Sequence, residues 1–333
     1  MSDETRRVNA DIRENEILEI SRELLETLLT DHTTHKNIFW ATDDYSERGE
    51  GYQFSDPITI EAITGENGNV IIPRALKNRV QQQQRSREMA EVFTPSWICN
   101  KQNNLIDNAW FGREGVFNVE IDEEGGKHSW VVNKENIEFP EGKTWRDYVN
   151  ENRMEITCGE APYLVSRYDA VTGEWIEPER RIGILDRKLR VVNENTETTG
   201  EWLKAAQAAY QSTYGYEWQG DNLVLAREAM LYTFIDYYKL KFKKEPLLKS
   251  LLYIAYIISW NVWQMDGLKG VIPNSCGERR TVEINLFGET EQVSHCEGCR
   301  TGDIHKHNGK YALIKDWGAQ KAKQKIRFID LIK

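Results

Sequence analysis

Short strand-like runs alternate with helical runs along this chain from residue 153 onward. The runs EITC (155–158), YGYEWQ (214–219) and NVWQMD (261–266) are separated by long segments with the apolar spacing of helices. Strands that are separated by helices pair in parallel, because the helix carries the chain back to the start of the next strand. The sequence therefore predicts an α/β fold with a parallel sheet.

An acidic residue lies in or at the end of each of these strand-like runs, near the expected carboxyl end of the strand. These residues are Glu155, Glu217 and Asp266, and Gly159 directly follows the first run. Ligands of open α/β sheets bind at the carboxyl ends of the strands, and a glycine lets a ligand approach the backbone. Acids there can accept hydrogen bonds from ribose hydroxyls and an adenine amino group, so we expect a nucleoside-containing cofactor. The alternative is that CGEAP (158–162) is only a tight turn before a helix.

The order of four segments adds to this expectation. EVFTP (91–95), EITCGEAPYL (155–164), YGYEWQGDNLVLAR (214–227) and NVWQMDGL (261–268) together resemble the adenine-N6 DNA methyltransferases, the M subunits of type I and fused type II restriction–modification systems. The resemblance covers roughly residues 85–270. It implies a Rossmann-like, S-adenosylmethionine-dependent methyltransferase sheet, with double-stranded DNA as the partner that is modified.

The resemblance also implies a role for each matching residue. The cofactor-binding residues would be Phe93, Thr94 and Pro95 at the methionine end of S-adenosylmethionine, Glu155, Cys158 and Gly159 in the loop beneath it, Glu217 at the ribose hydroxyls, Trp218 against the adenine, and Asp266 at the adenine amino group. The loop departs from the family pattern, because Glu160-Ala161-Pro162 stands where the family has Ser-Gly. This departure adds a negative charge beside the expected cofactor.

The family transfers the methyl group with an Asn-Pro-Pro-Tyr or Asp-Pro-Pro-Tyr segment, which this sequence lacks. The nearest equivalent is YALIKDW (311–317), where Asp316 and Trp317 pair an acid with an aromatic ring and are the candidate catalytic residues. The alternative is that this run is a buried strand that closes the domain. We expect weak or no transfer by this chain alone, and a second subunit that supplies target recognition or the missing segment. A second hypothesis is a non-catalytic, zinc-containing module that binds DNA or a partner.

The segment 274–310 is poor in apolar residues and rich in Cys, His and Gly. A Cys-x-x-Cys pair with a further Cys and a downstream His supplies the four tetrahedral ligands of a structural zinc. The expected ligands are Cys276, Cys296, Cys299 and His307, and His307 is preferred to His305 because HNG indicates a turn. Reduced surface thiols are the alternative.

These segments predict a domain organisation. It consists of an N-terminal helical region with a basic, Gln-rich helix (1–90), a methyltransferase-like domain (91–273) with a hairpin insertion at about 112–150, a zinc-binding insertion (274–310), and a closing strand with a basic tail (311–333). The opening residues have no apolar core for a signal peptide, and the longest apolar run, 247–260, is too short to span a bilayer. We therefore expect a cytoplasmic protein.

The net charge of −10 does not favour nucleic-acid binding by the chain as a whole. Two stretches differ, because 73–89 and 321–333 carry clustered Lys and Arg, either as solvated faces or as nucleic-acid contacts. A nuclease is a further alternative, since Asp186-x-Lys188 with Asp169 or Glu177 matches part of a metal-dependent nuclease site. The run LDRKLRVV (185–192) is equally natural as the start of a helix.

Overall fold

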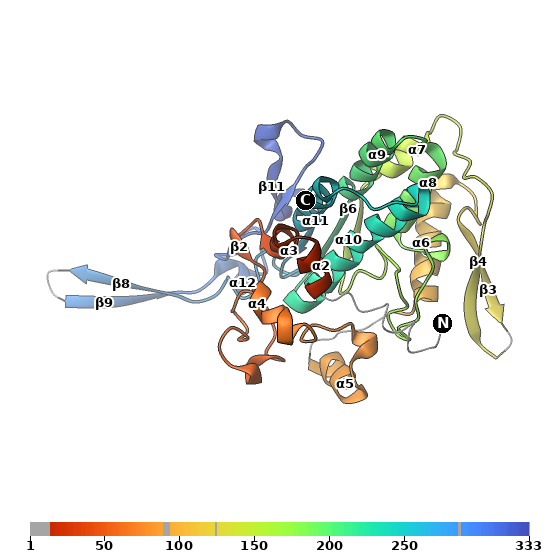
Figure 1. Cartoon of the computed structure of the whole chain (residues 1–333). Helices are drawn as coiled ribbons and strands as arrows, with labels where there is room; N and C mark the ends of the chain where they lie inside the picture. The colour runs from red at the N-terminus through yellow and green to blue at the C-terminus, as the bar shows by residue number, and fades with distance from the viewer. Residues whose placement is uncertain (1–13, 89–93, 124, 286–287, 333) are drawn as a thin grey trace.

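A three-stranded parallel sheet in the order β5-β6-β7 forms the centre of the protein. Figure 1 labels its middle strand, β6. The strands are β5 (Arg153–Ile156), β6 (Thr213–Glu217) and β7 (Val262–Gln264). The connections are helical, with α8 (Ile184–Asn195) and α9 (Thr199–Gln211) before β6, and α10 (Gly220–Phe242) and α11 (Leu248–Asn261) before β7. This computed structural model describes residues 14–88, 94–123, 125–285 and 288–332, and over these ranges it confirms a mixed α/β fold.

The main hydrophobic core lies between the helices and one face of this sheet. Helix α10 crosses the middle of the molecule and is buried on nearly all sides, which explains why its apolar residues do not form a single stripe (Figure 1). Trp202 of α9, Phe234 of α10 and Ile258 of α11 are all fully buried in this core. The helices therefore cover the sheet face that carries Gly215 and Val262.

A C-terminal hairpin covers the opposite face of the sheet. Strands β10 (Leu313–Lys315) and β11 (Lys325–Arg327) pair antiparallel, and short helices η5 (Lys321–Lys323) and η6 (Phe328–Leu331) flank β11. A second core cluster forms there from Tyr216, Trp263, Met265, Ala312, Ile314 and Phe328. The predicted terminal strand thus exists, but it pairs with β11 and packs across the sheet rather than extending the parallel ladder.

The N-terminal region begins with two short helices. These are α2 (Glu14–Ile20) and α3 (Arg22–Leu29), which are separated at Ser21 and are followed by the strand pair β1 (Thr30–Asp31) and β2 (Lys36–Asn37). Helix α3 packs on α11. The remaining elements to residue 88 are η1 (Ser46–Arg48), α4 (Ile60–Ile63), η2 (Gly65–Asn67), η3 (Arg74–Leu76) and the basic helix α5 (Arg79–Glu88).

Residues 94–150 contact α8 through two helices, α6 (Ser96–Phe111) and α7 (Trp145–Asn150). Helix α6 leads to the antiparallel hairpin β3 (Asn118–Glu123) and β4 (Lys127–Val132), and α7 precedes β5. The structure therefore confirms a hairpin within 112–150. The helix η4 (Pro178–Arg180) lies on the connection between β5 and α8.

A second hairpin projects away from the body of the molecule. Strands β8 (Arg279–Asn285) and β9 (Gly288–Ser294) form a long two-stranded ribbon, and α12 (Glu297–Thr301) follows at its base (Figure 1). A two-stranded ribbon is marginally stable by itself, so its base requires an anchor. The predicted metal ligands lie at this base.

Candidate functional site

The three predicted acids lie at the carboxyl edge of the parallel sheet. Glu155 is the penultimate residue of β5, Glu217 is the last residue of β6, and Asp266 lies two residues beyond β7. The register places Glu217 opposite Gln264, and the Met265 N–H donates to the Glu217 carbonyl over 2.9 Å. Parallel pairing therefore brings three acids that are far apart in sequence to one edge.

Glu217 joins the ends of two strands. Its Oε2 accepts a hydrogen bond from the Gly159 N–H at 2.9 Å, and its Oε1 accepts one from the Gln219 N–H at 3.2 Å. Burial raises the pKa of Glu217 to about 7, against the lowering effect of these N–H groups. Gly159 has φ +52°, and a Cβ placed there would meet no atom within 4 Å. The carboxylate thus lies beside a glycine with open space above it.

Glu155 organises the loop that follows its strand. Its carboxylate accepts hydrogen bonds from the N–H groups of Leu164 at 3.2 Å and Tyr163 at 3.4 Å. Burial raises the pKa of Glu155 well above its ordinary value, and the nearby charge of Glu217 adds to this. The residue as a whole is 8% exposed. Glu155 therefore positions the turn and does not itself face an open site.

Cys158 supports the same loop from below. Its side chain is buried and packs so closely on β6 that a Cβ at Gly215 would come within 3.2 Å of its Sγ. Burial, followed by the charges of Glu155 and Glu217, raises the pKa of the Cys158 thiol well above its ordinary value. The thiol is therefore neutral and has a packing role.

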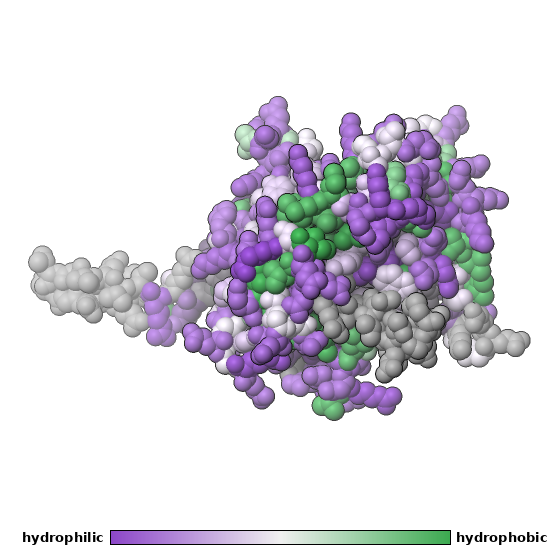
Figure 2. All heavy atoms as spheres, in the orientation of Figure 1, coloured by the Kyte–Doolittle hydropathy of each residue, from purple (hydrophilic) through white to green (hydrophobic). Residues whose placement is uncertain are grey.

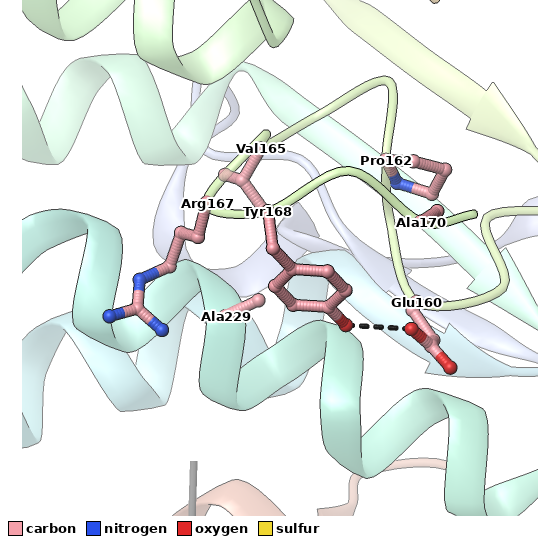
Figure 3. Close-up of a pocket in the computed structure, with 7 residues that line it drawn as sticks. All are labelled: Glu160, Pro162, Val165, Arg167, Tyr168, Ala170 and Ala229. Atoms are coloured by element: carbon pink, nitrogen blue, oxygen red, sulfur yellow. Dashed lines mark hydrogen bonds between the residues drawn. The ribbon is translucent and has the colours of Figure 1, made fainter. Parts of the chain in front are cut away.

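The structure shows how Glu160-Ala161-Pro162, which stands where the family pattern has Ser-Gly, is accommodated in the loop. Glu160 turns away from Glu217, accepting hydrogen bonds from the Arg74 N–H at 2.7 Å and from the Tyr168 hydroxyl at 2.6 Å. Ala161 has φ +63°, which is the left-handed backbone that favours the glycine of the family pattern. Figure 3 shows the small pocket at this loop, lined by Glu160, Pro162, Val165, Arg167, Tyr168, Ala170 and Ala229.

An N-terminal segment, residues 39–41, completes the carboxyl edge, which the sequence did not reveal. The Gln264 amide accepts from the Phe39 N–H at 3.0 Å and donates to the Phe39 carbonyl at 2.8 Å. The indole Nε1 of Trp218, a predicted adenine contact, donates to the Ala41 carbonyl at 3.1 Å. A buried glutamine inside an otherwise apolar strand was the only sequence hint of this segment.

Asp266 is committed to a turn. Its Oδ1 accepts from the Leu268 N–H at 3.0 Å, and its Oδ2 lies 3.2 Å from the Lys269 Nζ. The Asp266 side chain is 7% exposed. It therefore lies at the predicted edge, while both of its oxygens already have partners in the turn.

The segment around Thr94 and Pro95 lies against the loop after β5. Pro95 is the N-cap of α6, and the Cys99 thiol of this helix donates to the Thr94 carbonyl at 3.6 Å. Asn103 of the same helix donates to the Tyr163 carbonyl at 3.0 Å. Phe93 lies outside the described residues. The structure thus brings Thr94 and Pro95 to the loop that Glu155 organises.

The candidate catalytic pair lies at the other edge of the sheet. The Trp317 Nε1 donates to the Asn261 Oδ1 at 2.7 Å, and Asn261 immediately precedes β7. Asp316 closes a turn, because its Oδ1 accepts the N–H groups of Gly318 at 2.9 Å and Ala319 at 3.2 Å. The C-terminal hairpin folds back across the sheet and so carries this pair to the amino ends of the strands. The structure does not bring Asp316 and Trp317 to Glu217.

The residues of the nuclease alternative have structural roles. Asp186 caps the start of α8 and accepts hydrogen bonds from the N–H groups of Ser166 at 2.8 Å and Gly183 at 3.2 Å. The Lys188 Nζ is buried and donates to the Glu151 carbonyl at 2.6 Å and to the Ser212 Oγ at 2.7 Å. The helix-start interpretation of this run therefore fits the structure.

The four predicted metal ligands converge at the base of the β8–β9 hairpin. The ligand atoms of Cys276, Cys296, Cys299 and His307 all lie within 4.8 Å of one another and could hold a metal ion. The three sulfur atoms lie 3.5, 3.5 and 3.7 Å from the His307 Nδ1. A tetrahedral zinc with Zn–S of about 2.3 Å and Zn–N of about 2.1 Å separates its ligands by about 3.5–3.8 Å.

The backbone around this cluster is shaped for close approach. The Cys299 and Asn308 N–H groups point at the Cys296 Sγ, at 3.5 and 3.4 Å. A Cβ at Gly298 would come within 2.7 Å of the His307 Nδ1, so only glycine fits there. N–H donors to a sulfur and glycines beside the ligands are features of thiolate metal centres.

The basic helix α5 is partly a structural element. The Arg85 guanidinium is buried and contacts the Asp221 carboxylate at 2.9 Å and the Gln219 Oε1 at 2.7 Å. Arg79 and Arg87 are exposed. One of the two basic stretches is therefore only partly available to an external partner.

Comparisons with protein-family models, with curated proteins and with solved structures found no match for this chain. None of the helices in the described ranges combines the length and the apolar composition that a membrane-spanning segment needs.

Proposed function

We propose that this chain binds S-adenosylmethionine at the carboxyl edge of its parallel sheet, as a subunit of an adenine-N6 DNA methyltransferase of a restriction–modification or phage DNA-modification system. The observation that carries the proposal is the position of Glu217 at the end of β6, hydrogen-bonded to Gly159 of the neighbouring loop. An acid at the end of the second strand, beside a glycine loop after the first, is the arrangement that grips a ribose in Rossmann-like sheets.

Each residue at this edge would contact a different part of the cofactor. Glu217 would accept the ribose hydroxyls, and the open space over Gly159 would admit the cofactor to the backbone. Thr94 and Pro95 would contact the methionine end, and Trp218 would lie against the adenine. Asp266 would reach the adenine amino group only if it exchanged its bond to the Leu268 N–H.

Methyl transfer would need residues from another chain. The sequence has no Asn-Pro-Pro-Tyr segment, and Asp316 and Trp317 lie at the opposite edge from Glu217. Strand β5 offers a place for that chain, because it pairs with β6 alone in the described sheet and its Met154 and Ile156 are 39% and 66% exposed. A bare edge with exposed apolar side chains is suited to an added strand.

Calorimetric titration with S-adenosylmethionine tests the binding proposal. Wild-type protein should bind one equivalent. Glu217→Gln should raise the dissociation constant about tenfold or more, because the variant loses the charged group that accepts hydrogen bonds from the ribose hydroxyls. Glu179→Gln, a change of an exposed glutamate on η4, is the matched control and should bind as wild type does. Absence of binding by the wild-type protein would refute the proposal.

Tritiated methyl transfer to adenine in unmodified DNA tests the need for a partner. The lone chain should show little or no transfer, and co-expression with neighbouring subunits should restore it. Strong transfer by the lone chain would contradict the partner requirement.

We also infer that the Cys/His cluster holds a structural Zn²⁺. Three cysteines and a histidine with no open position are typical of a structural zinc, and the hairpin that leaves this cluster needs an anchor. Metal analysis of protein purified without added metal should find about one zinc per chain. A stoichiometry near zero would contradict the inference.

A second candidate function is a non-catalytic module that binds DNA or a partner. The position of Asp316 and Trp317 away from Glu217 favours it, as does the projecting β8–β9 hairpin (Figure 1). The calorimetric titration separates the two candidates, because such a module need not bind the cofactor.

A further inference from the structure

A surface rich in lysine and aromatic residues lies at the amino edge of the sheet, opposite the edge that carries Glu217. Helix α11 and the β10–β11 hairpin build it together, and we call it the amino-edge surface. Its members are Tyr253 and Tyr256 of α11, Lys315 and Trp317 at the end of β10, and Lys321, Lys323 and Lys325 of η5 and β11. Figure 2 shows the hairpin as a mostly hydrophilic projection beside the apolar atoms over α3 and α11.

The aromatic rings of this surface form a continuous row. The rings of Tyr253 and Tyr256 are 6.3 Å apart and nearly parallel, at 24°. The Trp317 ring meets Tyr256 edge-on at 6.1 Å. Tyr253 is 40% exposed, so the end of the row is open to solvent. The exposed ring of Tyr253 can stack with a flat ligand.

Lysine side chains are held beside these rings. The Lys315 Nζ lies 4.1 Å from the centre of the Trp317 ring and 4.7 Å from that of Tyr256, and it donates to the Tyr256 hydroxyl at 3.0 Å. The Lys325 Nζ lies 5.5 Å from the ring of Trp260. Contact with rings fixes the ammonium groups without neutralising them.

The local charge is opposite to that of the whole chain. Residues 315–327 contain four lysines and one arginine against one acid, while the chain carries −10. That acid, Asp316, is turned into the N–H groups of Gly318 and Ala319. Helix α11 contains no acidic residue. Within the described ranges, no ion pair joins these four lysines to a carboxylate, and Lys321, Lys323 and Lys325 are exposed to solvent.

We propose that the amino-edge surface binds single-stranded nucleic acid, with phosphates on the lysines and a base stacked on the exposed ring of Tyr253. Positive charge attracts the phosphate backbone, and exposed rings stack with bases only where those bases are not already stacked in a duplex. The combination of both features on one surface selects a single strand. This site is separate from the carboxyl edge and does not depend on the proposed cofactor.

Fluorescence anisotropy with a labelled 20-nucleotide oligothymidine tests the proposal. The charge-reversed variant Lys321→Glu, Lys323→Glu, Lys325→Glu should bind at least tenfold more weakly than wild type in low salt. The slope of log affinity against log salt should fall by about 2, since three phosphate contacts at about 0.7 each are lost. The matched control is Lys101→Glu, Lys134→Glu, Lys204→Glu, which changes the net charge equally at exposed lysines elsewhere and should bind within twofold of wild type.

A second variant separates stacking from charge. Tyr253→Ala should weaken binding of the single strand at least fivefold and leave binding of a 20-base-pair duplex within twofold, because a duplex has no free base faces. Circular dichroism checks the fold of each variant, and the neutral triple Lys→Gln variant replaces the reversed one if that variant unfolds. Equal weakening by the charge-reversed and control variants, or duplex binding as tight as that of the single strand, would overturn the proposal.

Discussion

The buried carboxylate of Asp221 fastens the N-terminal region to the start of α10, and its removal should cost much of the stability of the protein. Its Oδ2 lies 2.8 Å from the Tyr45 hydroxyl, 2.9 Å from the Arg85 Nη1 and 3.6 Å from the Lys77 Nζ. Burial is the largest single effect on the pKa of Asp221 and raises it. The charges of Arg85 and Lys77 together outweigh burial and hold this pKa well below its ordinary value. We therefore choose Asp221→Asn, which keeps the shape and removes the charge.

The magnitude follows from these distances. At an effective dielectric constant of about 20, the Arg85 and Lys77 contacts are worth about 6 and about 5 kcal/mol before desolvation is subtracted. Breaking a buried ion pair from one side costs about 3–5 kcal/mol, since the remaining charges stay buried. For 333 residues an unfolding entropy of about 2.1 cal/mol/K per residue converts this cost to a fall in Tm of roughly 4–7 °C.

Urea unfolding and thermal melts, both followed by circular dichroism, measure the effect. Asp43→Asn, at a neighbouring exposed position, is the control and should change the free energy of unfolding by less than about 0.5 kcal/mol. Lys77→Met should cost less in the Asp221→Asn background than in the wild type, because the two charges interact. A loss below about 1 kcal/mol for Asp221→Asn, or strictly additive costs, would refute the reasoning. The stabilising effect of Asp221 should be full above pH of about 4 and should fade as the pH drops, since its pKa is lowered in the folded state.

Three further predictions concern the other sites. Cys296→Ser should release the bound metal and make the β8–β9 hairpin sensitive to protease. The control His305→Ala should keep about one equivalent of metal, measured by atomic emission. Metal retained in the serine variant would disprove the ligand set. Affinity for S-adenosylmethionine should rise about tenfold from pH 6 to pH 8. The reason is that the Glu217 carboxyl, with a pKa of about 7, passes from about 10% to about 90% ionised over this range. If Glu217→Gln shows the same pH profile, Glu217 is not the group that accepts the ribose hydroxyls. Lys188→Met should lower the free energy of unfolding by about 1–3 kcal/mol, since the Glu151 and Ser212 acceptors lose their donor, and plasmid DNA with Mg²⁺ should remain uncut by the wild-type protein.

The strands and helices around the sheet could be predicted because each one's apolar pattern lies within a short stretch of the sequence. The runs that form β5, β6 and β7 carry their apolar residues and their terminal acids within a few positions, and parallel pairing then fixed where those acids meet. The metal cluster was predictable for the same reason, since ligand type and spacing carry the chemistry. The position of Asp316 and Trp317 could not be predicted, because it depends on β10 pairing with β11 and crossing the sheet.

The open edge of the sheet was equally hidden from sequence reasoning. The β5 sequence does not show that Ile156 is 66% exposed, because an apolar residue in a strand is ordinarily buried. Nor do the residues around Gln264 indicate that its side-chain amide will donate a hydrogen bond to the backbone of Phe39. These are properties of the assembled fold, and they decide what the candidate site can do.

The bond between Phe39 and Gln264 also sets the order in which the protein can be completed during synthesis. The two residues are 225 positions apart, which at about 5–20 residues per second is an interval of roughly 11–45 s on the ribosome. Trp40 and Ala41 can pair early with the backbone of Asp56 and Phe54, but throughout that interval the Phe39 backbone lacks its partner Gln264. The carboxyl edge therefore cannot close before Gln264 has been made, and a nascent chain that stops short of residue 264 cannot build it.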